Sequence, residues 1–205
     1  MGSKNKLKRF NENDSFNNVF QPKRGELVDQ TYPLKGHWNQ KFFKNSNPLV
    51  LELGCGKGEY TIGLAERYPD KNFIGIDIKG ARFWRGAKTA VEKQLPNVAF
   101  IRAQIELVES LFASNEIDEI WITFPDPQIK YKRTKHRMTN DAFLKRYKNI
   151  LNDNGVMHLK TDSEFMHGYT LGLLHGQGHE VLYSNHDVYR QEGSPDEVIT
   201  IQTFY

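Results

Sequence analysis

Cysteine is almost absent from this chain of 205 residues, since Cys55 is its only one. A single thiol excludes intrachain disulfides and zinc sites built from several cysteines. No apolar run approaches the roughly 20 residues of a membrane helix, and no signal peptide precedes the fold. The seven histidines show no metal-ligand spacing. We therefore expect a cytoplasmic protein with no membrane contact and no metal.

Net charge is small, at +3, but it is unevenly distributed. Residues 1–24 carry a net charge of +4, residues 129–148 carry +7, and residues 161–205 carry −6. Such segregation indicates one face that meets a polyanion. A solvated charged surface explains a charge run by itself equally well.

The chain length fits one domain with a sizeable core, preceded by a segment of different character. Residues 1–47 are predicted to form a basic, partly flexible N-terminal arm, because the first 24 residues are polar and rich in asparagine. A helix is expected within residues 35–44. Residues 48–205 are predicted to form the main domain.

From residue 48 the chain alternates between strand and helix patterns. Short apolar runs predict five strands, which are Leu49–Leu53, Asn72–Asp77, Val98–Arg102, Glu119–Phe124 and Val156–Thr161. Helices are predicted near 59–68, 80–94, 105–113, 140–151 and 164–175. Two further β-rich runs, 179–185 and 198–205, predict an antiparallel pair. The sum is an α/β, doubly wound, Rossmann-like domain with a seven-stranded, mostly parallel sheet and an antiparallel C-terminal strand pair.

Polar side chains lie at the carboxyl ends of four of the predicted parallel strands. They are Asp77, Gln104, Asp126 and Asp162. In such sheets, ligands bind at the carboxyl ends of the strands, near the switch in strand order. The shared position of these side chains therefore predicts a ligand site at this edge.

A glycine turn ends the first of these strands. Its glycines are Gly54, Gly56 and Gly58, and Glu52 stands two residues before the first. Glycine lets the backbone approach a ligand, and Asp77 at the tip of the next strand suits the two hydroxyls of a ribose. A nucleotide-like ligand is predicted, with Glu52 holding an ammonium group directly or through water. Helix–strand packing, a nicotinamide site, or a Glu52–lysine pair are the alternatives.

Cys55 lies inside this turn, where a nucleophilic role is conceivable. No activating base is indicated nearby, so the interpretation as a small residue that fits the turn is favoured.

A second motif, Phe-Pro-Asp-Pro at residues 124–127, follows the fourth strand. Two prolines restrict the backbone around Asp126, which favours a fixed functional carboxylate over a plain turn residue. The run after it, residues 130–137, mixes cations with an aromatic residue, as contacts with phosphates and bases require. Asp162 closes the fifth strand and either accepts hydrogen bonds from a guanine or caps the next helix with Ser163.

These motifs, in this order, resemble those of the bacterial tRNA (guanine-N(7)-)-methyltransferase family, within the class I S-adenosylmethionine-dependent methyltransferases. The resemblance covers roughly residues 48–205. It rests on Leu-Glu-Leu-Gly-Cys-Gly-Lys-Gly at 51–58, Gly75-Ile76-Asp77-Ile78, Phe124-Pro125-Asp126-Pro127, Lys160-Thr161-Asp162 and a closing Thr203-Phe204-Tyr205. The glycine motif alone marks only class I methyltransferases, and Phe-Pro-Asp-Pro with the basic run narrows it to this family.

The resemblance implies a class I methyltransferase fold and a tRNA (guanine(46)-N(7))-methyltransferase. Such an enzyme moves a methyl group from S-adenosylmethionine to N(7) of a guanine in the tRNA variable loop and leaves S-adenosylhomocysteine. Asp126 matches the catalytic position. The implied cofactor positions, with the turn glycines, are Glu52, Gly54, Gly56, Gly58, Asp77, Gln104 and Asp126. The implied substrate contacts are Lys130, Asp162 and Thr203, and the implied RNA contacts are Lys132, Arg133, Lys135, His136 and Arg137.

The chain departs from the family pattern in three places. Gln128-Ile129 stands where a tryptophan is usual, Gln104 stands where an aspartate is common, and the chain stops at Tyr205 where a glutamate would follow. The alternative functions are a class I methyltransferase acting on a small molecule or another RNA, and a non-catalytic RNA-binding protein. The sequence leaves open whether the protein is a monomer or a homodimer.

Overall fold

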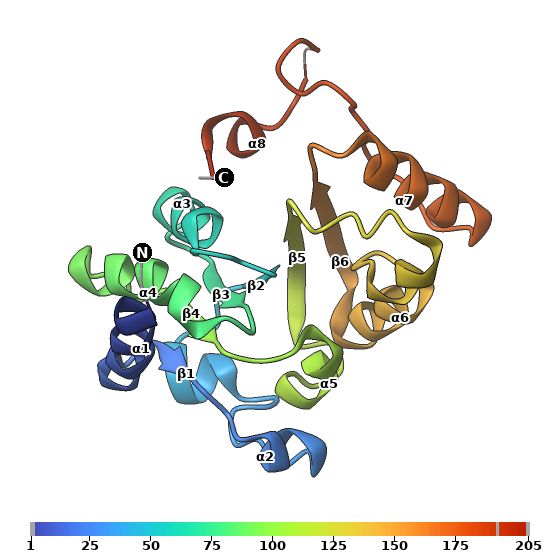
Figure 1. Ribbon diagram of the computed structural model, residues 1–205. Helices are drawn as coiled ribbons and strands as arrows, with labels where there is room; N and C mark the ends of the chain where they lie inside the picture. Colours follow the sequence, from blue (N-terminus) through green and yellow to red (C-terminus); the bar gives the residue numbers. More distant parts are fainter. Residues whose placement is uncertain (1–2, 192, 204–205) are drawn as a thin grey trace.

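The computed structural model of the protein describes residues 3–191 and 193–203, which form a twisted sheet between two layers of helices (Figure 1). In the described residues the sheet has six strands in the order β1-β4-β3-β2-β5-β6, and all neighbouring strands are parallel. The strands are β1 (Val19–Phe20), β2 (Leu49–Leu53), β3 (Asn72–Ile76), β4 (Val98–Ile101), β5 (Ile117–Thr123) and β6 (Leu151–Lys160).

The helices alternate with these strands along most of the chain. The α-helices are α1 (Ser3–Glu12), α2 (Arg24–Val28), α3 (Glu59–Arg67), α4 (Gly80–Glu92), α5 (Val108–Leu111), α6 (Asp141–Ile150), α7 (Glu164–Gly176) and α8 (Asp196–Thr200). The shorter turns of helix are η1 (Asn13–Ser15), η2 (Trp38–Phe43, a π-helix), η3 (Ile105–Leu107) and η4 (Tyr131–His136). Four of the five strands predicted from apolar runs are present to within two residues at each end, and β6 begins at Leu151, five residues before the predicted start at Val156.

The core has two halves, one on each face of the sheet. Alternate residues of β2 belong to different halves, with Leu51 in one and Val50 in the other. Helices α3 and α4 cover the face of Val50, and η2, α5 and α6 cover the face of Leu51. Burial on both faces explains why β2 and β3 are apolar almost throughout.

The strand order switches direction between β2 and β5. The chain runs outward from β2 through β3 to β4, and then returns to place β5 on the other side of β2. In this kind of sheet the loops that follow the strands separate at the switch and leave a crevice at the carboxyl ends. The glycine turn after β2 and the Phe-Pro-Asp-Pro segment after β5 flank this point.

The N-terminal segment packs against the sheet domain. Helix α1 lies against α4 (Figure 1), where the indole nitrogen of Trp84 donates to the Glu12 carboxylate at 3.0 Å. The Asn13 side chain, 1% exposed, donates to the Gly80 carbonyl at 2.9 Å. Strand β1 then adds an unpredicted edge strand beside β4. The boundary at residue 47 and the partial flexibility of this segment stay predictions.

The predicted antiparallel C-terminal strand pair is wrong. Residues 179–185 have no regular structure, and α8 occupies much of the second run, whose last residues, 204–205, lie outside the described residues. Pro195 followed by Asp196 and Glu197 is a helix-start signal, and it prevails over the β-branched residues that follow. The sheet of the described chain therefore has six parallel strands in place of the predicted seven.

Candidate active site

The glycine turn after β2 folds back over the end of β3. The backbone N–H groups of Gly54 and Cys55 both donate to the Ile76 carbonyl, at 2.8 and 3.0 Å. Gly56 has a φ of +57° and no atom within 4 Å of where a Cβ would lie, so the loop is open there to a ligand. Gly58 has a different reason to be glycine: a Cβ would lie 2.6 Å from the Phe100 ring.

Asp77 ties this turn to the end of β3. One carboxylate oxygen accepts from the Gly56 N–H at 3.1 Å, and the other accepts from the Lys79 N–H at 2.7 Å. The side chain remains partly exposed, and each oxygen retains a lone pair for a further donor. The structure thus joins two predicted cofactor residues, Asp77 and Gly56, by a direct hydrogen bond.

Glu52 is a buried carboxyl at the switch between β2 and β5. It is 3% exposed. One of its oxygens accepts from the Thr61 N–H at 2.8 Å and from the Thr61 hydroxyl, and the other accepts from the Thr123 hydroxyl at 2.5 Å. Burial raises the pKa of this carboxyl to about 7, and Glu59 adds to the rise, while the bonds from Thr123 and Thr61 oppose it. These three bonds leave one lone pair of the carboxylate for a further donor.

Cys55 is buried beside these two acids. Burial raises the pKa of its thiol, and the charges of Glu52 and Asp77 raise it further. A thiol held in its protonated form is a poor nucleophile. The environment therefore favours the interpretation of Cys55 as a residue that fits the turn.

The Phe-Pro-Asp-Pro segment after β5 has an unusual backbone. Phe124 and Gln128 have φ values of +47° and +48°, in the left-handed region that favours glycine. Phe124 donates its N–H to the Lys160 carbonyl at 2.7 Å, and Gln128 donates its N–H to the Asp126 carboxylate at 3.1 Å. Asp126 itself is exposed, at the carboxyl edge of the sheet. The loop is built to present one carboxylate.

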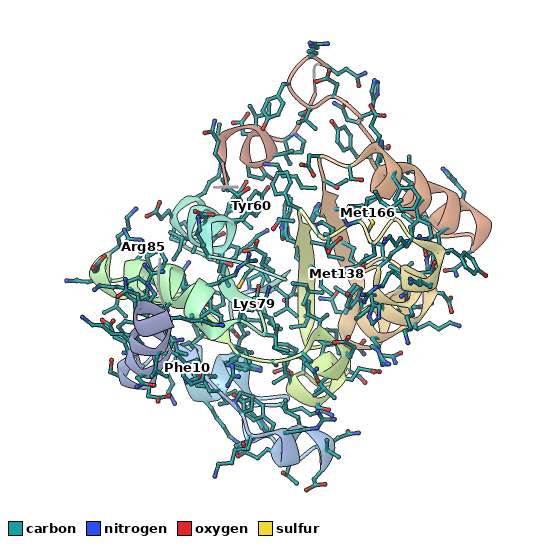
Figure 2. The ribbon with its side chains drawn as sticks, viewed as in Figure 1. Phe10, Tyr60, Lys79, Arg85, Met138 and Met166 are labelled. Carbon is teal, nitrogen blue, oxygen red and sulfur yellow. The ribbon has the colours of Figure 1, made fainter. Side chains whose placement is uncertain are left out.

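The basic segment, residues 130–137, follows this loop and contains η4. Lys130, Lys132, Arg133, Lys135 and His136 are exposed. Arg137 is different, because it is only 6% exposed. The next residue, Met138 (Figure 2), lies over the glycine turn, with its thioether 3.6 Å from the position of a Cβ on Gly54. The end of the basic segment and the glycine turn are thus neighbours.

The predicted substrate residues are Lys130, Asp162 and Thr203, and their role stays a prediction. No hydrogen bond or ion pair joins Lys130, Asp162 and Thr203 within residues 3–191 and 193–203. Ser163 caps α7 by accepting from the Met166 N–H at 3.2 Å, so the cap expected at this position belongs to Ser163. Asp162 is exposed just before that cap, and Gln104 is exposed after β4.

Lys160, for which no role was predicted, anchors the C-terminal segment. Its ammonium donates to the carbonyls of Val198 and Ile201 at 2.6 and 3.1 Å and lies 5.1 Å from the centre of the Tyr60 ring. Burial lowers the pKa of this lysine. Nothing in the spacing of Lys160 from these partners could have indicated the contact, since it joins segments about forty residues apart.

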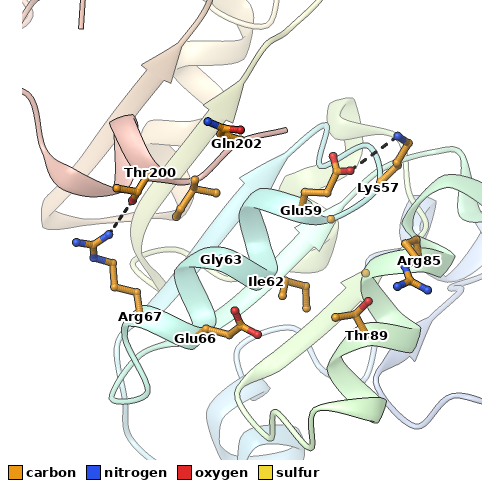
Figure 3. Close-up of a pocket in the computed structure, with 13 residues that line it drawn as sticks. Lys57, Glu59, Ile62, Gly63, Glu66, Arg67, Arg85, Thr89, Thr200 and Gln202 are labelled. Carbon is orange, nitrogen blue, oxygen red and sulfur yellow. Dashed lines mark hydrogen bonds and ion pairs between the residues drawn. The ribbon is translucent and has the colours of Figure 1, made fainter. Parts of the chain in front are cut away.

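A hollow of about 570 Å³ lies on the outer side of the glycine turn, between α3, α4 and residues 200–202 (Figure 3). It shares Lys57, Gly58 and Glu59 with the turn region, but neither Glu52 nor Asp126 lines it. We place the candidate active site at the carboxyl edge of the sheet, where the loops after β2, β3 and β5 meet. This choice rests on the bonds between the loops after β2 and β3 and on the bond from Thr123 to Glu52, which joins the ends of β5 and β2.

The described residues contain neither a membrane-spanning helix nor a group of metal-ligating side chains. None of their helices combines the length and the apolar character of a membrane span. They contain no group of three or more histidine, cysteine or acidic side chains placed to hold a metal ion. The absence of a metal stays a prediction.

Comparison with known proteins identifies the family. A family model described as "Putative methyltransferase" matches residues 46–203. The tRNA (guanine-N(7)-)-methyltransferase of Christiangramia forsetii is 73% identical over 205 residues, which are 100% of this chain and 92% of the relative. The enzyme of the same name from Bacteroides fragilis is 46% identical over 202 residues, which are 98% of this chain and 79% of the relative.

A solved structure supports the fold. The aminoglycoside resistance methyltransferase NpmB1 matches with a TM-score of 0.51 at 20% identity, over 78% of this chain and 70% of that one. The predicted α/β methyltransferase fold is confirmed, and so is the resemblance drawn from the motifs. The chain belongs to the family of tRNA (guanine-N(7)-)-methyltransferases.

Proposed function

We propose that this chain is a tRNA (guanine(46)-N(7))-methyltransferase, which methylates N(7) of a guanine in the variable loop of tRNA with S-adenosylmethionine as donor. The observation that carries the proposal is the pair of loops at the β2/β5 switch. One is a glycine turn bonded to Asp77, and the other presents Asp126 and leads into the basic segment. Because its substrate is tRNA, the enzyme is proposed to work in the cytoplasm. It is proposed to be a monomer or a homodimer.

The residues around the glycine turn fit the proposed donor. The space over Gly56 is open, Asp77 has lone pairs for ribose hydroxyls, and Gln104 is exposed at the same edge for the adenine. Glu52 has one lone pair left, and burial raises its pKa. An ammonium group beside it would supply a compensating charge. When bound, S-adenosylmethionine supplies a methyl group on a positively charged sulfur.

Asp126 is proposed to orient the guanine and to stabilise the charge that develops on it. N(7) of guanine carries no proton, so no general base has to act before the attack. Alignment of the reacting atoms then carries most of the catalysis, and proximity can supply up to ~7–11 kcal/mol. The purine becomes positive as the bond forms, and a fixed carboxylate favours that charge. The two left-handed residues that flank the loop support the view that Asp126 is held in place.

The basic segment is proposed to bind the tRNA. Lys132, Arg133, Lys135 and His136 are exposed and follow the Asp126 loop directly, so cations there can hold phosphates near the reacting base. Lys130, Asp162 and Thr203 are proposed to contact the guanine nucleotide.

The product identifies the reaction. Unmodified tRNA incubated with donor carrying a labelled methyl group should yield labelled 7-methylguanosine on nucleoside analysis. A transcript with adenosine in place of guanosine 46 should stay unlabelled, although it binds equally well. Equal labelling of the two transcripts would refute the choice of position, and a label on any other atom of the purine would refute the reaction.

A further inference from the structure

The loop that carries Asp126 needs support from outside itself. Its two ends, Phe124 and Gln128, have φ values of +47° and +48°, in the left-handed region where residues other than glycine are disfavoured. Such conformations persist only where neighbouring groups fix them. The Phe124 end is fixed by the bond from its N–H to the Lys160 carbonyl. The Gln128 end requires an equivalent hydrogen bond from a group outside the loop.

Arg137 supplies it. Its Nε donates to the Gln128 carbonyl at 3.2 Å, and its Nη2 donates to the Ile129 carbonyl at 3.1 Å. The guanidinium thus holds two consecutive carbonyls, which fixes both the position and the direction of the chain that leaves the loop. A planar fork of donors is suited to this pattern, whereas a lysine ammonium is a single point charge on a flexible stem.

The other side of the guanidinium lies against α7. Its central carbon is 4.4 Å from the centre of the Tyr169 ring and 4.8 Å from that of Phe165. The two rings are nearly parallel, at 15°, and stand one helical turn apart. A cation against aromatic faces gains energy when it is shielded from water, and Arg137 is only 6% exposed. Arg137 therefore connects the Asp126 loop to a helix on the other side of the segment.

We propose that Arg137 is a positioning residue that holds the Asp126 loop in its catalytic conformation, and that it does not bind tRNA phosphate. The inference rests on the role proposed for Asp126. Within the basic segment the other cations are exposed and available to phosphates, while the donors of Arg137 are directed to protein carbonyls. Its place in a run of cations hides this difference at the level of sequence.

The substitution Arg137→Lys separates the two roles because it keeps the charge. Wild-type protein and R137K are compared in three measurements: the single-turnover rate of methylation at saturating tRNA, tRNA affinity by filter binding at several salt concentrations, and donor affinity by calorimetry. For a positioning residue, the rate falls by about tenfold or more while both affinities stay within about twofold. Weaker tRNA binding with a normal rate at saturation would overturn the proposal.

Two further variants serve as a control and as a second test of the same contact. Arg146→Lys is the matched control, because Arg146 lies on α6 with an ion pair to Glu109 at 3.4 Å, away from the site, and R146K should behave as wild type. Tyr169→Leu leaves Arg137 in place and removes one ring, so it should lower the same rate by a smaller factor. Normal single-turnover rates in both single variants, Y169L and R137K, would overturn the proposal. Thermal unfolding of each variant shows whether it is folded.

Hydrogen exchange separates a failure of this inference from a failure of the proposed function. In R137K, a peptide spanning residues 124–131 should exchange faster than in wild type, while peptides from β2 and β3 stay unchanged. Faster exchange would support the positioning role even if wild type methylated no tRNA. A lack of methylation by wild type would refute the proposed function alone. Unchanged exchange in that peptide would overturn the positioning role whatever the product.

Discussion

The substitution Glu52→Gln should make the stability of the ligand-free protein less sensitive to pH. Glu52 is 3% exposed, and burial raises the pKa of its carboxyl from 4.5 to about 7. The folded chain thus favours the neutral acid. Its stabilising contribution is complete below pH 4.5 and is lost as the pH rises through about 7. Glutamine has the shape of the neutral acid and does not ionise, so the variant avoids this loss.

The expected size follows from the pKa difference. A rise from 4.5 to about 7 corresponds to about 3 kcal/mol of unfolding free energy at full ionisation. Between about pH 5 and about pH 8, wild type should lose about 2–3 kcal/mol that E52Q retains. The amide can keep both partners, because its oxygen accepts from Thr61 and its NH₂ group can donate to the Thr123 hydroxyl, which reverses the direction of that bond.

Urea unfolding at both pH values measures this difference through tryptophan fluorescence. Glu66→Gln is the control, since the Glu66 side chain on α3 is 38% exposed and pairs with Lys93 at the surface. E66Q should follow the pH dependence of wild type to within about 0.5 kcal/mol. If the stabilities of E52Q and wild type change in parallel between the two pH values, the buried carboxyl is not neutral in the fold and the reasoning is refuted.

Two more predictions follow from the glycine turn and the basic segment. Gly58→Ala should lower the free energy of unfolding, measured in urea, by about 2–4 kcal/mol, because its φ is +77° and the Cβ would lie 2.6 Å from Phe100. The control is Gly168→Ala on α7, which should be neutral or stabilising because no atom lies within 4 Å of its Cβ position. Equal losses of stability in the two variants would contradict the clash. Alanine at both Lys132 and Arg133 should weaken tRNA binding and lower the slope of log affinity against log salt by about 2. An unchanged slope would exclude these two cations from phosphate contact.

The central fold was predictable because its signals are local. The run Leu49–Leu53 is apolar except for Glu52 because it is covered on both faces, and the glycines after it mark the turn directly. The edge strand β1 was missed since two residues, Val19 and Phe20, form it only by pairing with β4. The C-terminal pair was predicted from β-branched residues, but the helix start at Pro195 and the contacts of Lys160 determine that segment.

The candidate site was predicted in its residues more than in its connections. Sequence position alone placed Asp77 and Asp126 at the carboxyl edge, because parallel strands bring their ends together. The partners of Glu52 could not be predicted, since Thr61 and Thr123 are separated from it by 9 and 71 residues. Arg137 looked like one more cation of a basic run, and its bonds to two backbone carbonyls and its packing on the rings of α7 distinguish it.

The substitution Asp126→Asn tests the central claim most directly. The carboxylate is exposed at the tip of a fixed loop, and asparagine keeps its shape without its charge. Single-turnover methylation of saturating tRNA should fall by about 10²–10³-fold, while the affinity for S-adenosylmethionine, measured by calorimetry, changes by less than about threefold. A near-normal single-turnover rate in D126N would contradict the account, because methyl transfer would then not depend on this carboxylate.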